Sequence, residues 1–329
     1  QAAKQAAAKR VLYTEGEDVR VLRAAQQAFD EGIANPILVG RPDVIRSRIE
    51  ELGLHIRVER DVTVLDPHNT PRFQAYCELY HEIMGRDGVS PEAAQVAVRR
   101  SHTIIGALAL RLGDTDSMIC GLLGNYGRHL QSISNIIGLE KNAVNFAALN
   151  AVILDNQTLF IADTYVNENP SAEVLADIAR MAAVKVQRFG VTPRVAFLSH
   201  SNFGTSKRES AIKMRRAHEL FRQMAPHIAS EGELQGDSAI CAELRHSLLP
   251  SNRLEGSANI LICPNLDAAN IMFNVLKMTG GNGLTIGPTL LGAAASAHIL
   301  TPSATMRRIL NQTAIAVANA EVRRLACQK

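Results

Sequence analysis

The chain has 329 residues, of which 47% are hydrophobic and 20% are charged, so it can bury a sizeable core and is not disordered throughout. Its 35 Lys and Arg side chains nearly balance 32 Asp and Glu side chains, and Trp is absent. The resulting formal charge of +3 and the scarcity of aromatic residues exclude a protein whose main work is to bind nucleic acid. No apolar run approaches the ~20 residues of a membrane helix. At about 150 residues per domain, the length predicts two domains.

The first half of the chain alternates apolar strands with amphipathic helices. We expect strands over residues 11–14, 36–39, 62–65 and 117–120. We expect helices from residue 19 to a stop near Gly32, and over residues 42–52, 71–84 and 91–112. Strands that alternate with helices in this way favour a parallel sheet with helices on its faces.

The second half continues this alternation. Strands are expected over residues 160–163, 195–199, 260–263 and 284–286, and helices over residues 172–189, 206–224, 238–248, 268–278 and 303–327. The sequence therefore predicts an α/β fold with two lobes. Ligands of such folds bind where the carboxyl ends of strands meet, and a cleft between two lobes is a natural site.

Residues 198–206 form the most suggestive loop, because a hydrophobic strand leads into small and hydroxylic residues before a helix. Backbone N–H groups at such a helix start favour an anion, while ordinary capping by Ser or Thr explains the pattern equally well. The glycine-rich run 279–283 lacks the P-loop pattern and predicts a helix stop and turn. The basic pairs Arg99-Arg100 and Arg307-Arg308 are typical of a solvated helix face, with phosphate contacts as the alternative.

Cysteines and histidines give no sign of a metal site. The five cysteines are scattered without a Cys-x-x-Cys pair, which fits a reducing cytoplasm. We expect no signal peptide. The ten histidines, among them His129, His200 and His298 at expected loop edges, have no ligand-spaced neighbours, so we expect no bound metal. The first ten residues start without Met and are rich in Ala and Lys. That composition is typical of a helical linker.

Four segments together resemble one enzyme family. They are residues 160–170 (FIADTYVNENP), 198–201 (LSHS), 264–271 (PNLDAANI) and 286–292 (IGPTLLG). Their order and spacing resemble the phosphotransacetylases across the whole chain. The sequences of residues 162–167 and 199–204 more closely resemble one branch of this family, the C-terminal phosphotransacetylase-like domain of hybrid bacterial NADP-dependent malic enzymes.

The resemblance implies two α/β lobes, each a mostly parallel sheet flanked by helices. Lobe I would comprise residues 11–141 and 292–329, and lobe II, through which the family dimerises, residues 142–291. Residues 1–10 would be the linker from an upstream malic enzyme part that holds the NADP and divalent-metal sites. Acetyl-CoA or CoA would lie in the cleft between the lobes.

The residues that carry acetyl transfer in the family are replaced here. Active members have a Leu-Ser-Arg-Gly run and an aspartate base six residues after the arginine. This chain has Thr301 at the serine position, Pro302 at the arginine position and Arg308 at the aspartate position. Pro302 has neither charge nor N–H, and Arg308 cannot act as a base at neutral pH. We therefore expect little or no acetyl transfer.

An acyl-CoA site without catalysis predicts a sensor that lets acetyl-CoA inhibit the attached malic enzyme. The expected ligand-binding residues are Ser199, Ser201, Asn202, Thr205, Asn270, Lys277, Thr301, Arg307 and Arg308. Two alternatives stay open. One is an active phosphate acetyltransferase in which His298 or His200 serves as the base. The other is a purely structural module that only assembles the enzyme. We expect a homodimer within a larger homo-oligomer.

Overall fold

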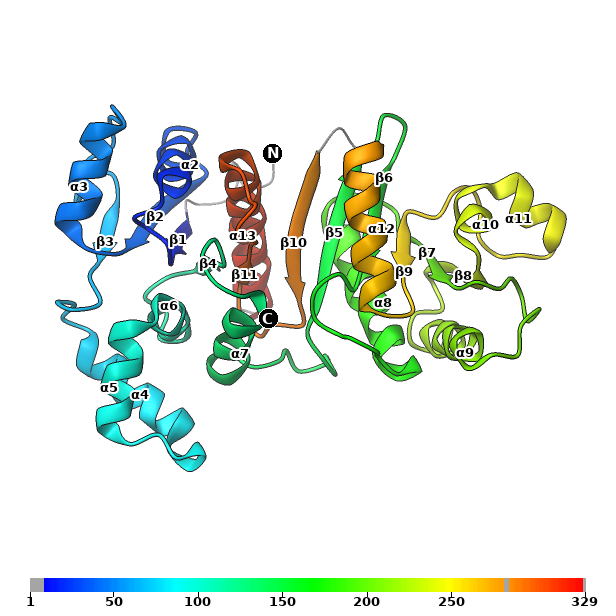
Figure 1. The fold of residues 1–329 in the computed structure, drawn as a ribbon, viewed down its shortest axis with the longest axis horizontal. Coiled ribbons are helices and arrows are strands. Elements are labelled where there is room, and N and C mark those ends of the chain that lie inside the picture. The colour runs from blue at the N-terminus through cyan, green and yellow to red at the C-terminus, as the bar shows by residue number, and fades with distance from the viewer. Residues whose placement is uncertain (1–8, 281–283, 328–329) are drawn as a thin grey trace. The chain divides into compact units, whose positions relative to one another are not determined.

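The computed structural model describes residues 9–280 and 284–327 (Figure 1). The chain divides into two compact units, one of residues 1–140 with 293–329 and the other of residues 141–292. The boundaries expected from the sequence were 141/142 and 291/292. Among the described residues, no helix has both the length and the apolar character that a membrane span requires.

Unit 1 is built on a five-stranded parallel sheet with the order β11-β4-β1-β2-β3. Its strands are β1 (Lys9–Tyr13), β2 (Ala34–Val39), β3 (Thr63–Leu65), β4 (Ser117–Cys120) and β11 (Ala297–Ile299). One face packs on α2 (Val19–Asp30), α3 (Pro42–Glu51) and α13 (Met306–Cys327). On the other face lies α6 (His102–Arg111), where a Cβ on Gly106 would come within 2.9 Å of the Leu12 side chain.

Three expectations for unit 1 are wrong. Lys9 and Arg10 are not linker but the start of β1, because Lys9 is buried against Glu321 at 2.7 Å and Arg10 pairs with Asp116 at 3.1 Å. Residues 91–112 form two helices, α5 (Pro91–Arg100) and α6, because the Ser101 hydroxyl accepts from the Ile104 N–H and starts a new helix. Neither His298 nor His129 is at a loop edge, because His298 lies within β11 and is 1% exposed, and His129 lies within the helix Tyr126–Ile136.

The remaining helices of unit 1 are α4 (Phe73–Met84), the 3-10 turn η1 (Gly85–Asp87) and α7 (Tyr126–Ile136). α4 and α7 contact α6, and η1 contacts α4. α4 packs on α5, α6 and α7. The sequence analysis assigned neither α7 nor the short β11, so the unit has more regular structure than predicted.

Unit 2 has a six-stranded sheet with the order β10-β5-β6-β9-β7-β8. β5 (Ala147–Ile153) runs antiparallel between β10 (Thr285–Leu291) and β6 (Thr158–Ala162). The others, β9 (Ile260–Ile262), β7 (Arg194–Leu198) and β8 (Ala229–Leu234), are parallel to β6. The predicted fold class, two mostly parallel sheets flanked by helices, is confirmed.

Alternating side chains of β7 bury both faces of this sheet. Val195 and Phe197 pack toward α8 (Ala172–Arg188) and α9 (Glu209–Met224). Ala196 and Leu198 pack toward α12 (Leu266–Thr279) and α10 (Gly236–Ile240). α8, α9, α10 and α12 each follow a parallel strand in the chain. Each of these helices starts near the carboxyl edge of the sheet, because that is where the preceding strand ends.

The helix expected over residues 238–248 is wrong as a single element. It is divided into α10 and α11 (Ala242–Leu248), with extended backbone at Cys241. The buried Arg245 guanidinium donates to the carbonyls of Ser238 and Ala239, which a continuous helix would bond to later N–H groups. The predicted stop after residue 278 is seen in α12, which ends at Thr279; residues 281–283 of that turn lie outside the described residues.

Candidate functional site

The carboxyl edge of the unit 2 sheet holds a cavity of about 500 Å³. Its wall comes from the loops that follow β6, β7 and β9 and from the facing turns of α9 and α12. The residues that line it are Asn169, Leu198, Ser199, His200, Ser210, Lys213, Gly236, Cys263, Pro264, Asn265, Ala268 and Met272. We call this space the carboxyl-edge cavity. None of these lining residues is a carboxylate.

Ser199 is the one predicted ligand-binding residue among those that line the carboxyl-edge cavity. Its backbone N–H donates to the Leu234 carbonyl at 2.7 Å, which fixes the end of β7. Its hydroxyl is buried and has no hydrogen-bond partner among the described residues. A buried hydroxyl without a partner is uncommon, because its desolvation is uncompensated. Ser199 therefore presents an unused donor and acceptor at the cavity.

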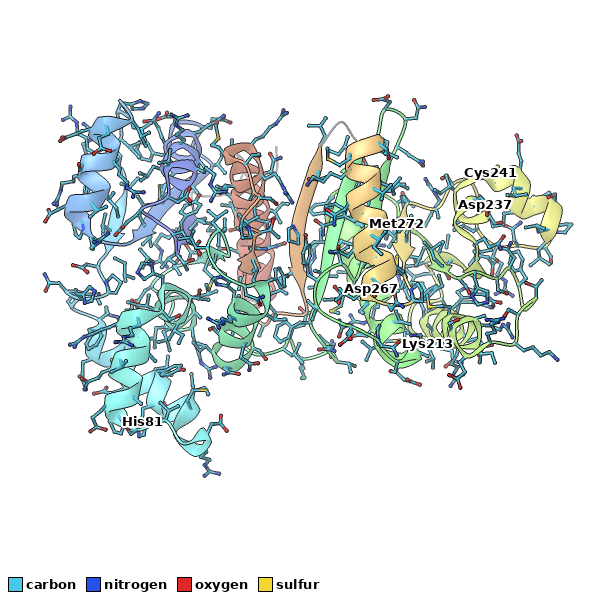
Figure 2. All side chains as sticks on the ribbon, in the orientation of Figure 1. His81, Lys213, Asp237, Cys241, Asp267 and Met272 are labelled. Atoms are coloured by element: carbon cyan, nitrogen blue, oxygen red, sulfur yellow. The ribbon has the colours of Figure 1, made fainter. Side chains whose placement is uncertain are left out.

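Lys213 supplies positive charge to the same cavity. Its Nζ donates to the Asn169 side-chain oxygen at 2.7 Å and to the Pro264 carbonyl at 2.8 Å. Burial lowers the pKa of this amine, and no carboxylate of the described chain forms an ion pair with it. Figure 2 shows Lys213 on α9 and Met272 on α12. The Met272 side chain contributes apolar surface to the wall of the carboxyl-edge cavity. The sequence analysis did not single out Lys213, since a lysine inside an amphipathic helix has no distinguishing pattern.

Two further lining residues limit the chemistry of the carboxyl-edge cavity. Burial raises the pKa of the Cys263 thiol to about 12, so it stays protonated near neutral pH. The His200 Nε2 lies 3.1 Å from the Ser206 hydroxyl, at the exposed side of the β7–α9 loop. The cavity therefore offers hydrogen-bond donors, a cation and apolar surface, but no carboxylate base and no thiolate.

Three other predicted residues of the β7–α9 loop bond to one another or to the end of β8. The Ser201 hydroxyl donates to Glu233 at 2.8 Å and contacts the Thr205 hydroxyl at 3.0 Å. Glu233 also accepts from Arg215 at 2.9 Å; burial acts to raise its pKa, but these donors outweigh it and the pKa is lowered. Asn202 exchanges hydrogen bonds with Gln235. These contacts shape the loop that carries Ser199.

The two predicted residues of α12 lie outside the wall of the carboxyl-edge cavity. The Asn270 amide donates to the Thr164 carbonyl at 3.1 Å and accepts from Asn274. Lys277 is half-buried in the last turn of the helix.

The motif at residues 160–170 is explained by Asp163. Its buried carboxylate accepts from the N–H groups of Ala148, Tyr165, Val166 and Asn167 and from the Asn167 amide. Burial nevertheless raises the pKa of Asp163. This aspartate folds the β6–α8 loop and so places Asn169 at the carboxyl-edge cavity.

The predicted residues of unit 1 lie between β11 and the first turn of α13. The Thr301 hydroxyl contacts the Ser303 hydroxyl at 3.1 Å. The Pro302 carbonyl accepts from Arg20 at 2.7 Å, and Arg20 in turn pairs with Asp18 at 2.8 Å.

The two arginines of the first turn of α13 have different surroundings. Arg307 is exposed and Arg308 is half-buried. They belong to unit 1, whereas the carboxyl-edge cavity belongs to unit 2.

His298 does not offer a base to a ligand. Its ring is buried, with the Gln312 amide 2.8 Å from Nδ1 and the Ser296 hydroxyl 3.2 Å from Nε2. The contacts place this imidazole in the core between β11 and α13, away from solvent.

Comparison with known proteins gives a consistent family. The profile of the phosphate acetyl/butaryl transferases matches residues 1–317. The chain is 49% identical over 316 residues to an NAD-dependent malic enzyme of Rhizobium meliloti, covering 96% of this chain and 41% of that protein. It is 46% identical over 319 residues to an NADP-dependent malic enzyme of Escherichia coli, covering 97% and 42%. The chain thus spans less than half the length of these relatives.

Solved structures agree with this result. A phosphotransacetylase from Streptococcus pyogenes superposes with a TM-score of 0.88 at 26% identity, covering 96% of this chain and 94% of that one. The similarity to phosphotransacetylases and to malic enzymes that the sequence motifs indicated is confirmed.

Proposed function

This chain belongs to the phosphate acetyl/butaryl transferase family, and from this premise we propose that it is the acyl-CoA-binding regulatory and dimerisation part of a malic enzyme, without acetyl transfer of its own. In this proposal an upstream part oxidises and decarboxylates malate to pyruvate with a nicotinamide coenzyme and a divalent metal. We assign NADP to that part and the cytoplasm to the whole protein. Because relatives are named for NAD and for NADP, malate oxidation rates with each coenzyme test the first assignment.

The observation that carries the ligand assignment is the buried, unpartnered hydroxyl of Ser199 in the carboxyl-edge cavity. The residues present fit part of an acyl-CoA. Ser199 would donate to a carbonyl of the acyl-pantetheine chain, Met272 and Ala268 would cover its apolar portions, and Lys213 would attract a phosphate. Acetyl-CoA or free CoA supplies these groups.

The segment that leads into α13 supports the absence of acetyl transfer. The transfer needs a base for the thiol and cations for the transferred phosphate. Pro302 contributes only a carbonyl, which Arg20 already occupies, and Arg308 stands where the family carries its aspartate. Each missing group of this kind costs on the order of 100-fold in rate.

Regulation requires that acetyl-CoA bind one conformation of the enzyme better than another. A ligand held by residues of unit 2, with Thr301, Arg307 and Arg308 of unit 1 as further expected contacts, would favour one arrangement of the two units. We propose that this preference lowers malate oxidation when acetyl-CoA accumulates.

The test combines binding and turnover on the full-length protein. We expect calorimetry to show acetyl-CoA binding, malate oxidation to fall with added acetyl-CoA, and no phosphate-dependent formation of acetyl-CoA. Robust transfer would instead favour an active acetyltransferase, for which His200 is the base nearest the cavity; His200→Ala and Thr301→Ala would then lower the rate. Absence of any thermal shift with acetyl-CoA, in a stable dimer, would favour the purely structural module.

A further inference from the structure

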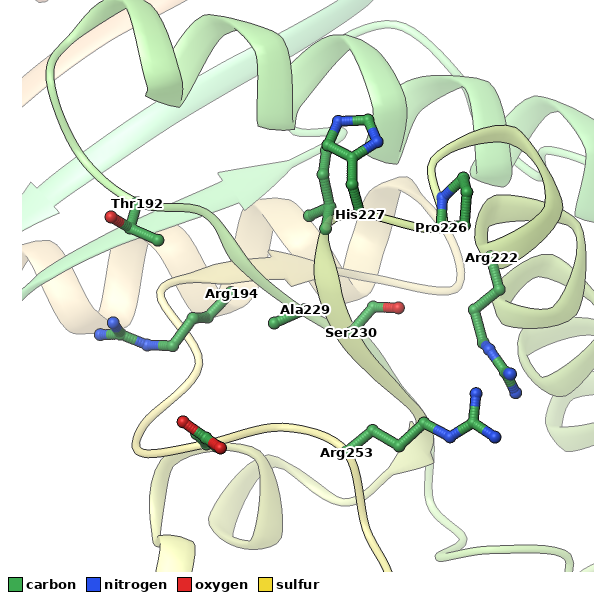
Figure 3. Close-up of a pocket in the computed structure, with 10 residues that line it drawn as sticks. Thr192, Arg194, Arg222, Pro226, His227, Ala229, Ser230 and Arg253 are labelled. Atoms are coloured by element: carbon green, nitrogen blue, oxygen red, sulfur yellow. The ribbon is translucent and has the colours of Figure 1, made fainter.

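A second cavity, of about 480 Å³, lies at the opposite edge of the unit 2 sheet, where β7 and β8 begin (Figure 3). Its charged and polar lining includes Arg194, Arg222, His227, Ser230, Arg253 and Glu255. We call it the arginine pocket. The five residues of β7 separate it from the carboxyl-edge cavity by about 15 Å. It is therefore a separate place on the molecule.

Two guanidinium groups face one another in this pocket. Arg222 comes from the last turn of α9 and Arg253 from the loop before β9, and their side chains point toward each other in Figure 3. Within the described residues, neither forms an ion pair with a carboxylate. By contrast, Arg215 and Arg216 of the same helix pair with Glu233 at 2.9 Å and with Glu219 at 3.4 Å. The two guanidinium groups repel each other, and an anion bound between them would attract both and offset that repulsion.

Arg194 adds a third cation on the other side of the arginine pocket. Its Nε donates to the Ser257 carbonyl at 2.6 Å, and its backbone N–H donates to the Asn259 side chain at 2.8 Å. These bonds hold the first residue of β7 in place. The positive charge at this side is thus positioned without a ligand, which lowers the ordering cost of binding.

The acidic groups around the arginine pocket do not balance these three arginines. Glu255 is the one carboxylate that lines it, among the described residues. Glu231, next to Ser230 on β8, accepts from the Arg253 N–H at 2.8 Å and raises the pKa of Arg245 by attraction, although burial lowers that pKa more. Glu231 thus contacts the backbone of Arg253, and even with its charge counted beside that of Glu255, the three arginines remain in excess.

We propose that the arginine pocket binds a phosphate group, either as free phosphate or as the phosphoryl group of a small metabolite. Paired guanidinium groups match the oxygens of a tetrahedral oxyanion, and Arg forms such contacts bidentately. Arg222 and Arg253 hold the phosphate, and Arg194 serves a second anionic group of a longer ligand. This site is independent of the acyl-CoA site proposed above, because no residue lines both cavities.

The test uses the full-length protein and three probes: inorganic phosphate, pyrophosphate and glycerol 3-phosphate. Calorimetry or phosphorus NMR measures their dissociation constants in wild type and in the R222Q/R253Q variant. A control variant, R188Q/R216Q, removes the same charge from exposed positions of α8 and α9. Lys213→Met reports any phosphate held in the carboxyl-edge cavity instead.

We expect R222Q/R253Q to weaken binding by about tenfold or more, while R188Q/R216Q leaves it near the wild-type value. A loss of phosphate binding in Lys213→Met but not in R222Q/R253Q would place the phosphate in the carboxyl-edge cavity and overturn the proposal. Binding in wild type should weaken as ionic strength rises. If pyrophosphate binds more tightly than phosphate and R194Q removes the difference, the ligand has two anionic groups. If glycerol 3-phosphate binds more tightly than phosphate, the ligand is a phosphomonoester. No binding of any probe to wild type, or equal binding in all variants, would overturn the proposal.

Discussion

Two serines of the β7–α9 loop stand in opposite situations, although only one residue separates them. The Ser199 hydroxyl has no partner among the described residues, while the Ser201 hydroxyl donates to Glu233 at 2.8 Å. We expect Ser199→Ala to leave the free energy of unfolding within about 0.5 kcal/mol of wild type, since no bond is lost. The same variant should weaken acetyl-CoA binding by about tenfold. Denaturant unfolding and calorimetry measure the two effects.

Ser201→Ala is the matched control. It removes a donor from the buried carboxylate of Glu233, so we expect it to lower the free energy of unfolding by about 1–3 kcal/mol. Equal losses of stability in both variants would show that the Ser199 hydroxyl is bonded in the folded protein. Equal acetyl-CoA affinity in Ser199→Ala and wild type would remove Ser199 from the site.

Glu15 gives unit 1 a pH-dependent stability. Burial raises its pKa from 4.5 to about 7, although the Gly121 N–H donates to its carboxylate at 3.1 Å. Between these values the folded protein binds more protons than the unfolded chain, so this contribution stabilises at low pH and is lost as pH rises through 7. We expect the unfolding free energy of wild type minus that of Glu15→Gln to fall by about 3 kcal/mol from pH 5 to 8.

Glu17 provides the control for that titration. Hydrogen bonds from Arg41 lower its pKa to about 2, so it is ionised in both states throughout this range. The corresponding difference for Glu17→Gln should therefore be constant between pH 5 and 8, by urea unfolding at each pH. A constant difference for Glu15→Gln as well would mean that its carboxyl titrates near its ordinary value.

At the scale of elements, one buried arginine organises the segment between β8 and β9. Arg245 is 1% exposed, and its guanidinium donates to the carbonyls of Ser238, Ala239, Leu254 and Gly256 and to the Asn252 side chain. Arg245→Met would leave these acceptors unsatisfied, so we expect a loss of about 3–5 kcal/mol in unfolding free energy. Amide exchange in residues 236–256 should accelerate.

Lysine at this position should restore only part of the loss, because an ammonium cannot reach five acceptors spread around a planar group. The control is Arg216→Gln on the exposed face of α9, expected within about 0.5 kcal/mol of wild type. A small effect of Arg245→Met, comparable with that of the control, would contradict this account.

Strands with a continuous apolar run were predictable, and those without one were not. Residues 117–120 of β4 were predicted with both ends correct. The strand β8 was not predicted, because its sequence, ASEGEL, contains two glutamates. Those carboxylates are buried with partners supplied by distant residues, such as Arg215 for Glu233. The helix breaks at Ser101 and Cys241 were not predicted for a related reason. Capping by the Ser101 hydroxyl decides the first, and the guanidinium of Arg245, four residues after Cys241, decides the second.

At the scale of the whole molecule, the two-lobed α/β fold followed from the alternation of strands and helices, but the site followed only in part. The carboxyl end of β7 was predicted as a ligand loop, and Ser199 lines a cavity there. Lys213 and Asn169 were not predicted as cavity-lining residues, because their positions depend on how α9 and the β6–α8 loop fold back to that edge. Ser201 and Asn202 share the polar pattern of Ser199, so sequence alone could not separate loop-forming from cavity-lining residues.

The dimerisation that we propose for unit 2 needs an exposed apolar surface, and α12 carries exposed apolar side chains. Ile271, Val275 and Met278 are 62%, 53% and 73% exposed, and their spacing aligns them along one side of the helix, which covers β5 and β6 (Figure 1). We expect Ile271→Glu with Val275→Glu to raise the dimer dissociation constant at least about tenfold, since each places a charge in an apolar interface. Sedimentation measures this.

The control for that experiment is Val96→Glu on α5 of unit 1, where the side chain is 51% exposed and lies outside the stripe. All these positions are solvent-exposed in the described structure, so the melting temperature extrapolated to the monomer should stay unchanged in every variant. Loss of the dimer only in the α12 variant places the interface on this helix. If the α12 variant stays dimeric at the same concentrations as Val96→Glu, the chain assembles through another surface, and acetyl-CoA must act within one protomer.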